Sequence, residues 1–186
     1  MKRLLVPLLL ALAAAGCGSG EESTAPAPAT LSGSALQELD SRQRTLDAET
    51  LAEDSYGPEA LARVLAEGGY TIGSEREFSG KSRTFDHVVA RTLHFESAAG
   101  AESYLDWFRN HANDFLGRSE TAKLAPPGQS GAAFSLAACG SCKKEVPTFL
   151  AGWRRGEVVL TLLAGGSGAN PERFSSLAHE LDETVG

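Results

Sequence analysis

Two of the three cysteines stand close enough in the sequence to work as a pair. Cys139 and Cys142 enclose only Gly140 and Ser141. Two thiols at this spacing can close a short disulfide, exchange disulfides with another protein, or supply two metal ligands. A structural zinc site needs about four ligands. The histidines that could complete one are scattered and show no His-x-x-x-His spacing: His87, His94, His111 and His179. We therefore predict no metal and keep metal handling as an alternative.

The N-terminus determines which of these chemistries is available. It carries Lys2 and Arg3, an apolar run over residues 4–15, and then Gly16 and Cys17. The run is shorter than the roughly 20 apolar residues of a transmembrane helix and fits a secretory signal. Its end, Ala-Ala-Gly-Cys, resembles the lipobox of bacterial lipoproteins. The resemblance implies cleavage after residue 16, a diacylglyceryl thioether on Cys17 and acyl chains such as palmitate. The alternative is an ordinary signal peptide with an incidental Cys17.

Export would place the Cys139–Cys142 pair in an oxidising compartment, where disulfides persist. We therefore predict a short structural disulfide between them. The alternative is thiol–disulfide exchange, because Cys139 to Lys143 resembles a thioredoxin motif and Val146-Pro147-Thr148 resembles that family's proline loop. In thioredoxins a strand-helix-strand unit separates these elements, whereas here three residues separate Cys142 from Val146. This order favours the structural disulfide.

No other motif predicts catalysis. The sequence has no Gly-x-Ser-x-Gly elbow. The glycine run over residues 165–168 lacks the Lys-Ser/Thr ending of a phosphate-binding loop, so we predict a strand-to-helix connection there. The carboxylates are spaced as on solvated helix faces rather than as an acid/base pair. We predict no catalytic residue and no bound cofactor.

Charge and composition exclude other classes of protein. The net charge of −7 provides no basic surface for nucleic acid, and cleavage of the signal removes two further cations. An acidic domain is repelled by anionic lipid, so the lipid on Cys17 must hold it at the membrane. Residues 17–33, rich in Gly, Ser, Pro, Ala and Thr, are predicted to form the lipidated cysteine and a flexible linker.

Residues 34–186 are predicted to form a single α+β extracytoplasmic domain. Hairpins dominate the pattern, which favours an antiparallel sheet of about five strands with helices packed on it. On the predicted strand 83–96, His87 and Arg91 share the apolar face and mark a strand end, a polar cleft or a twisted edge. The predicted helices are 34–55, 58–67, 98–116 and 171–185, the strands are 70–78, 83–96, 132–138, 147–154 and 157–164, and residues 118–131 form a loop.

The pattern of the domain resembles a group of bacterial proteins. The run RTLHFESAAGAESYLDWFR from Arg91, the hairpin WRRGEVVLTLL from Trp153 and the closing helix are similar to small extracytoplasmic lipoproteins of actinobacteria. Similar patterns occur in sensor domains of actinobacterial kinases and in PsbP-like proteins. The resemblance implies helices on an antiparallel sheet but no particular reaction. We predict a non-catalytic domain at the outer face of the cell membrane that binds a small ligand or an envelope protein, or supports an envelope complex.

The substitution Cys17→Ala tests the anchor. It should abolish acylation and leave either unprocessed precursor or a soluble, mis-cleaved form. Labelling with a fatty-acid analogue and membrane fractionation measure both effects. A Cys17→Ala protein that still takes up label and fractionates like wild type contradicts the lipobox interpretation.

Overall fold

The computed structural model describes residues 31, 33–55, 57–137 and 145–185. Its centre is one seven-stranded antiparallel sheet in the order β1-β2-β3-β7-β6-β5-β4. The strands are β1 (Asp40–Leu46), β2 (Tyr70–Ser79), β3 (His87–Phe95), β4 (Ser119–Thr121), β5 (Gln129–Leu136), β6 (Thr148–Arg155) and β7 (Val158–Gly165). The predicted α+β class is confirmed, although the sheet has two strands more than expected.

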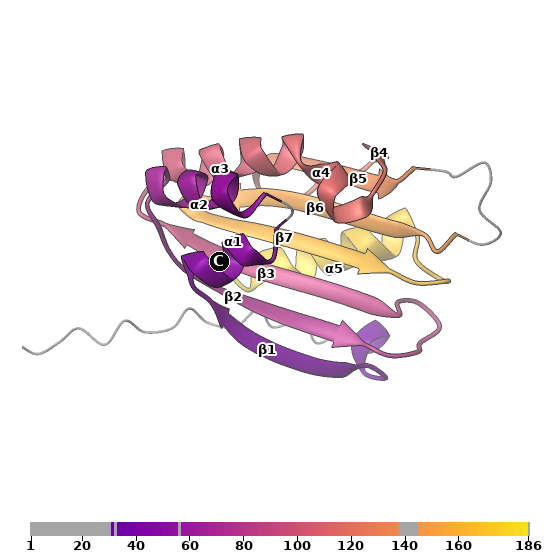
Figure 1. Ribbon diagram of the computed structural model, residues 1–186. Coiled ribbons are helices and arrows are strands. Elements are labelled where there is room, and N and C mark those ends of the chain that lie inside the picture. The colour runs from indigo at the N-terminus through magenta and orange to yellow at the C-terminus, as the bar shows by residue number, and fades with distance from the viewer. Residues whose placement is uncertain (1–30, 32, 56, 138–144, 186) are drawn as a thin grey trace, which may run out of the picture.

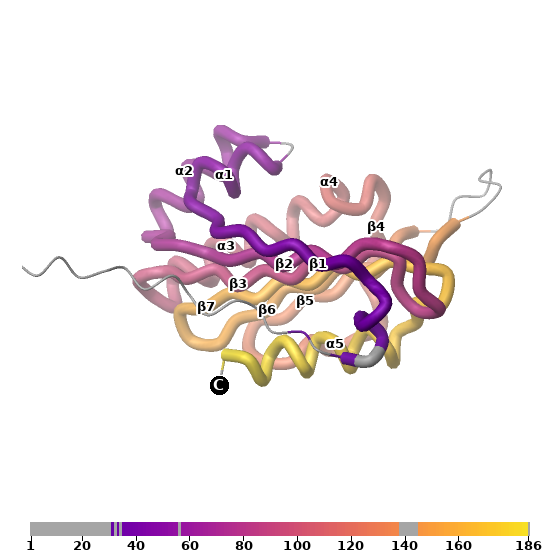
Figure 2. Tube along the Cα trace, turned by 90° about the horizontal axis from the view of Figure 1, so that it is seen from below, coloured from indigo at the N-terminus to yellow at the C-terminus, as the bar shows by residue number. Residues whose placement is uncertain are grey.

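Helices cover both faces of this sheet, so the molecule has three layers (Figures 1 and 2). One face carries α1 (Ala48–Glu53), α2 (Pro58–Glu67), α3 (Ala98–Asn110) and α4 (Ala112–Leu116). The other carries α5 (Pro171–Glu183) and the short η1 (Ser34–Leu36). Within the described residues, no helix is both long and apolar enough to cross a membrane.

Each helix layer encloses its own apolar core. The α5 side buries Phe85, Trp153, Leu160 and Phe174, and the α1–α4 side buries Leu93, Tyr104, Leu105 and Phe108. The helix α5 is fixed to β6 by the buried Asp182, which accepts hydrogen bonds from Trp153 Nε1 at 2.9 Å and from the guanidinium of Arg155. Both layers therefore depend on the same central strands.

The predicted helix over 34–55 is wrong. The segment forms η1, then β1, and then α1. Its leucines, which we placed on one helix, divide between the two cores: Leu36 and Leu39 lie on the α5 side, and Leu46 lies with α1 and α2. Apart from Leu46, β1 is exposed on both faces, so it lacks the alternation that would identify a strand.

Two further expectations need correction. The predicted loop 118–131 contains β4 and the start of β5. The predicted helix 98–116 is interrupted at His111, where φ is −115° and the chain leaves helical geometry between α3 and α4. The break lets Phe115 of α4 pack against Phe108 and Trp107 of α3, with ring centroids 5.6 and 6.2 Å apart.

Other local signals act as the sequence predicts. The Ser97 side chain caps α3 by accepting from the N–H of Gly100, and Asn170 caps α5 by accepting from that of Arg173. Gly117, with φ of 71°, ends α4. The β6–β7 hairpin forms one residue later than expected, and Gly156 provides the positive φ of 58° that its turn requires.

Truncation of one side chain in each core tests this division. Phe108→Ala and Leu160→Ala should each lower the free energy of unfolding by about 2–5 kcal/mol, because both side chains are fully buried. Gly152→Ala provides the control, since its Cβ would lie 2.7 Å from Cε1 of Phe108. It should destabilise the wild type and cost much less in Phe108→Ala. Chemical denaturation measures the wild type, the three single variants and the double variant of Phe108 and Gly152, and equal costs of Gly152→Ala in both backgrounds contradict the packing described.

Candidate functional site

The helix layer α1–α4 leaves part of the sheet uncovered. In Figure 1, no helix lies in front of the right-hand halves of β1, β2 and β3, between α1 and α4. Side chains on this side of β1, β2, β3 and β7 form what we call the open face. It contains Arg44, Glu75, Glu77, His87, Val89, Arg91, Thr161 and Leu163.

One cross-strand row on the open face concentrates charge. Arg44, Glu75 and Arg91 stand directly opposite one another on β1, β2 and β3, and Thr161 follows on β7. Directly opposed side chains on one face of a sheet interact closely. The row therefore places the carboxylate of Glu75 between two guanidinium groups.

The row closes into a ring of ion pairs with the end of α1. Arg44 Nε donates to Glu75 Oε1 at 2.7 Å, and Arg91 Nε donates to Glu75 Oε2 at 2.6 Å. Arg44 Nη2 also donates to Asp54 Oδ2, which lies 3.7 Å from Arg91 Nη2. We call Arg44, Asp54, Glu75 and Arg91 the ion ring. It joins three strands to the segment between α1 and α2.

Because Glu75 is buried, the fold must keep both of its arginine partners in place. The Glu75 side chain is only 6% exposed. Burial by itself raises the pKa of Glu75, but the hydrogen bonds and charges of Arg44 and Arg91 outweigh it and hold the pKa below its ordinary value. A buried carboxylate is tolerated only where its partners are in place. The ring therefore fixes the register of β1, β2 and β3.

A small hollow of about 110 Å³ adjoins the ring at Arg91. The polar groups at its wall come from Arg91, His87, Thr161 and Tyr104, and none of these is a carboxylate. Burial raises the pKa of Tyr104 to about 12, so its hydroxyl stays protonated. The remaining walls are apolar: Val89, Phe108, Phe115, Leu150 and Leu163.

Two further hollows adjoin the ring. One, of about 200 Å³, lies beside Asp54 and is lined by Ser55, Trp107, Asp114 and Phe115. Another, of about 380 Å³, lies on β1 and β2 beside Arg44 and Glu75. Phe115 borders both the hollow at Asp54 and the one at Arg91. The open face is therefore hollowed on several sides of the ion ring.

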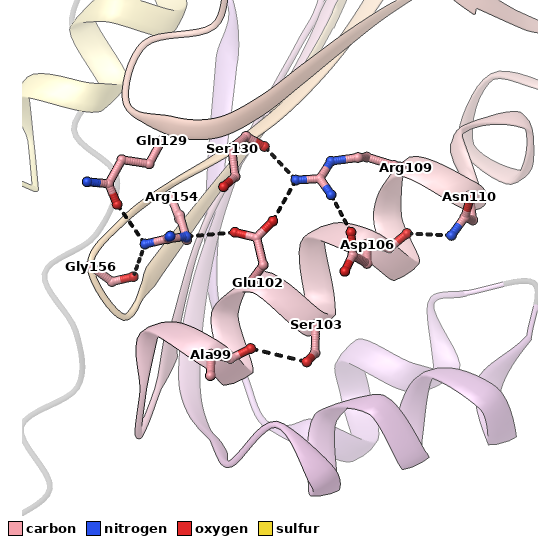
Figure 3. A network of polar contacts seen from close by, with 10 residues as sticks. All are labelled: Ala99, Glu102, Ser103, Asp106, Arg109, Asn110, Gln129, Ser130, Arg154 and Gly156. Atoms are coloured by element: carbon pink, nitrogen blue, oxygen red, sulfur yellow. Dashed lines mark hydrogen bonds and ion pairs between the residues drawn. The ribbon is translucent and has the colours of Figure 1, made fainter.

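The helix α3 is held against β5 and β6 by a second polar network (Figure 3). Glu102 accepts hydrogen bonds from Arg109 at 2.9 Å and from Arg154 of β6 at 2.8 Å. Arg109 also donates to the carbonyl of Ser130 at 2.8 Å. The Ser130 side chain and the two arginines, against the opposing effect of burial, lower the pKa of Glu102 to about 2. This network fixes the helix that carries Tyr104 and Phe108.

The cysteines that we singled out, Cys17, Cys139 and Cys142, lie outside the described residues, so the lipobox and the disulfide stay predictions. The histidines are dispersed. His111 stacks on Trp107 with ring centroids 4.5 Å apart, and His94 faces the opposite side of the sheet from Arg91. Among the described residues, no cluster of histidine and acidic side chains is arranged to hold a metal.

Of the strand end, polar cleft or twisted edge that we offered for His87 and Arg91, the structure places His87 at the first residue of β3. Both line the hollow on the open face. Sequence reasoning missed Arg44, Asp54 and Glu75, because the first two fell on the incorrectly predicted helix 34–55. A signal was present, since Arg91 on an apolar face requires a counter-charge on a neighbouring strand.

Comparison with known proteins shows a likeness in fold. No family model and no curated protein matches this chain. The chain is similar to a solved structure, the extracellular domain of PknH from Mycobacterium tuberculosis, with a TM-score of 0.54 and 14% identity over 80% of this chain and 84% of that one. At this identity the likeness shows the fold alone. A fold shared with a mycobacterial extracellular domain agrees with the resemblance to actinobacterial extracytoplasmic domains.

A matched pair of substitutions tests the ion ring. Glu75→Gln should lower the free energy of unfolding by about 3–5 kcal/mol, because it leaves two arginines without their buried counter-charge. Glu102→Gln, at a more exposed network, should cost no more than about 1 kcal/mol. Urea denaturation at neutral pH measures both. Equal costs contradict the assignment of Glu75 as the ring's centre.

The acid dependence of stability provides a second measure of Glu75. Its pKa lies below the ordinary value of 4.5. Its contribution to stability is therefore present above pH 4.5 and is lost as the pH falls through the folded-state pKa. Wild type should lose more stability than Glu75→Gln over this acid range.

Proposed function

We propose that this protein is a lipid-anchored extracytoplasmic domain that binds a small molecule on its open face and catalyses no reaction. The anchor rests on the lipobox at Cys17, and the outer location rests on the signal sequence. The fold shared with the extracellular domain of PknH supports the same location.

A binding role is supported by the hollow at Arg91. Small-molecule sites in proteins are concave and mostly apolar, with a few converging polar groups. The hollow at Arg91 has this composition, since the polar groups of Arg91, Thr161 and His87 meet the apolar side chains of Val89 and Leu163. This is the observation that carries the proposal.

The chemistry of the open face favours binding over reaction. Two carboxylates at this face, Glu75 and Asp54, are engaged by arginine, and a third, Glu77, lies 3.6 Å from His87 Nδ1. Glu75 is a poor general base, because its two arginine partners hold its pKa below the ordinary carboxyl value. The hydroxyls at the hollow belong to Thr161 and Tyr104, and no described histidine hydrogen-bonds to either. The face therefore lacks an activated nucleophile among the described residues.

A fragment screen by NMR tests the function on the full-length chain. Fragments should shift resonances around Arg91, Thr161 and Leu163, and Leu163→Glu should remove these shifts by placing a charge in the hollow. Val146→Glu is the control, because Val146 is exposed and does not line the hollow at Arg91. Fragments that bind elsewhere, or that bind Leu163→Glu equally well, contradict the proposed site.

A further inference from the structure

The polar atoms at the hollow beside Arg91 are unusual because their hydrogen-bonding capacity is largely unused. Arg91 Nε donates to Glu75, whereas its two Nη atoms form no hydrogen bond with any described residue. Arg91 Nη2 lies 3.7 Å from Asp54 Oδ2, which is beyond hydrogen-bond distance. Yet the Arg91 side chain is only 16% exposed. A largely buried guanidinium thus keeps up to four N–H groups available.

Two hydroxyl groups at the hollow also have no hydrogen-bond partner among the described residues. Thr161, which stands directly opposite Arg91 on β7, is 6% exposed, and Tyr104 is 1% exposed. Neither hydroxyl hydrogen-bonds to another residue in the described part of the chain. Both hydroxyl oxygens can still be reached from the hollow, since the fully buried side-chain atoms without a partner among the described residues are Ser74 Oγ, Thr92 Oγ1 and Trp107 Nε1. All three residues line one hollow, so a single ligand that carries hydrogen-bond acceptors can satisfy them together.

We propose that the hollow binds the carboxylate of a small monocarboxylic acid with an apolar body. This inference rests on the proposed function and names its ligand class. The two Nη atoms of Arg91 match the two oxygens of a carboxylate in a bidentate arrangement. The Thr161 hydroxyl donates to one of the same oxygens. The hydrocarbon part of the acid packs against Val89, Leu163 and Phe115.

The charge around the hollow disfavours a ligand with two negative charges. Glu75 and Asp54 already neutralise Arg91 and Arg44 within the ion ring. The chain as a whole is acidic, with a net charge of −7. A dianionic phosphate would add two negative charges at this balanced site, whereas a carboxylate adds one. The apolar walls also favour a hydrocarbon body over a sugar or a nucleotide.

The size of the hollow favours a small acid. Its volume of about 110 Å³ lies below the roughly 300–1,000 Å³ of most ligand pockets. A branched acid with a four-carbon body fits this space. We therefore choose 3-methylbutanoate as the probe. The corresponding amide and amine, which have nearly the same shape but no carboxylate, are the comparison compounds.

Titration of the full-length chain by NMR tests the ligand class. The acid should shift the resonances of Arg91 and Thr161, and the amide and the amine should bind at least tenfold more weakly. Thr161→Val, which keeps the shape and removes the hydroxyl, should weaken the acid about fivefold, as expected for one hydrogen bond. Thr121→Val, on the exposed strand β4, is the matched control and should bind as wild type does. Arg91→Lys keeps the charge but loses the two Nη groups. The folded variant should therefore also bind the acid more weakly.

The outcomes separate the two proposals. If the amide or the amine binds as tightly as the acid, or if Thr161→Val binds the acid unchanged, the carboxylate assignment is wrong. If fragments occupy the hollow but no acid does, the ligand class fails while the binding function stands. If neither fragments nor acids bind the open face, the proposed function fails and this inference fails with it.

Discussion

The buried carboxylate of Glu75 is the constraint on which the open face depends. A charge placed in the middle of a sheet must be neutralised where it stands, and only side chains directly opposite on the neighbouring strands are near enough. Arg44 of β1 and Arg91 of β3 meet this condition. A slip of one residue in either pairing would turn one arginine to the other face and leave Glu75 with only one of its two partners. The edge strand β1, which has little apolar surface, thereby gains a defined register.

The same constraint explains why a cleft lies beside the ring. The helix layer covers the apolar part of the sheet, where Leu93, Phe95 and Val159 are buried beneath α3. The charged row extends beyond that layer, since Arg44 is 44% exposed at its outer end. The hollow at Arg91 lies at the boundary, where the apolar core gives way to the row of charges. A site of this kind combines apolar walls with oriented donors.

The sequence predicted those elements in which local chemistry and burial agree. The helix α5 has an asparagine cap, a proline at its first position and a regular apolar face, and all three point to the same element. The β6–β7 hairpin is similarly consistent, since both strands are buried and Gly156 supplies the turn. The prediction for β1 failed because an exposed edge strand is stabilised by its pairing with a neighbouring strand. Such a pairing leaves no local signature in the sequence. The ion ring was hidden for the same reason: Arg44 and Glu75 are 31 residues apart, and only the sheet's register brings them together. Arg91 could be singled out because a charge on an apolar face conflicts with its surroundings.

Glu75 holds both arginines through their Nε atoms, while the Nη atoms of Arg91 stay available. NMR of the arginine side chains tests this arrangement through the exchange of each Nε–H with water. We expect slow exchange at Arg44 and Arg91, with both protected signals lost together in Glu75→Gln. The exposed Arg42 of β1 provides the fast-exchanging reference. Exchange at Arg91 as fast as at Arg42 would overturn the ion ring.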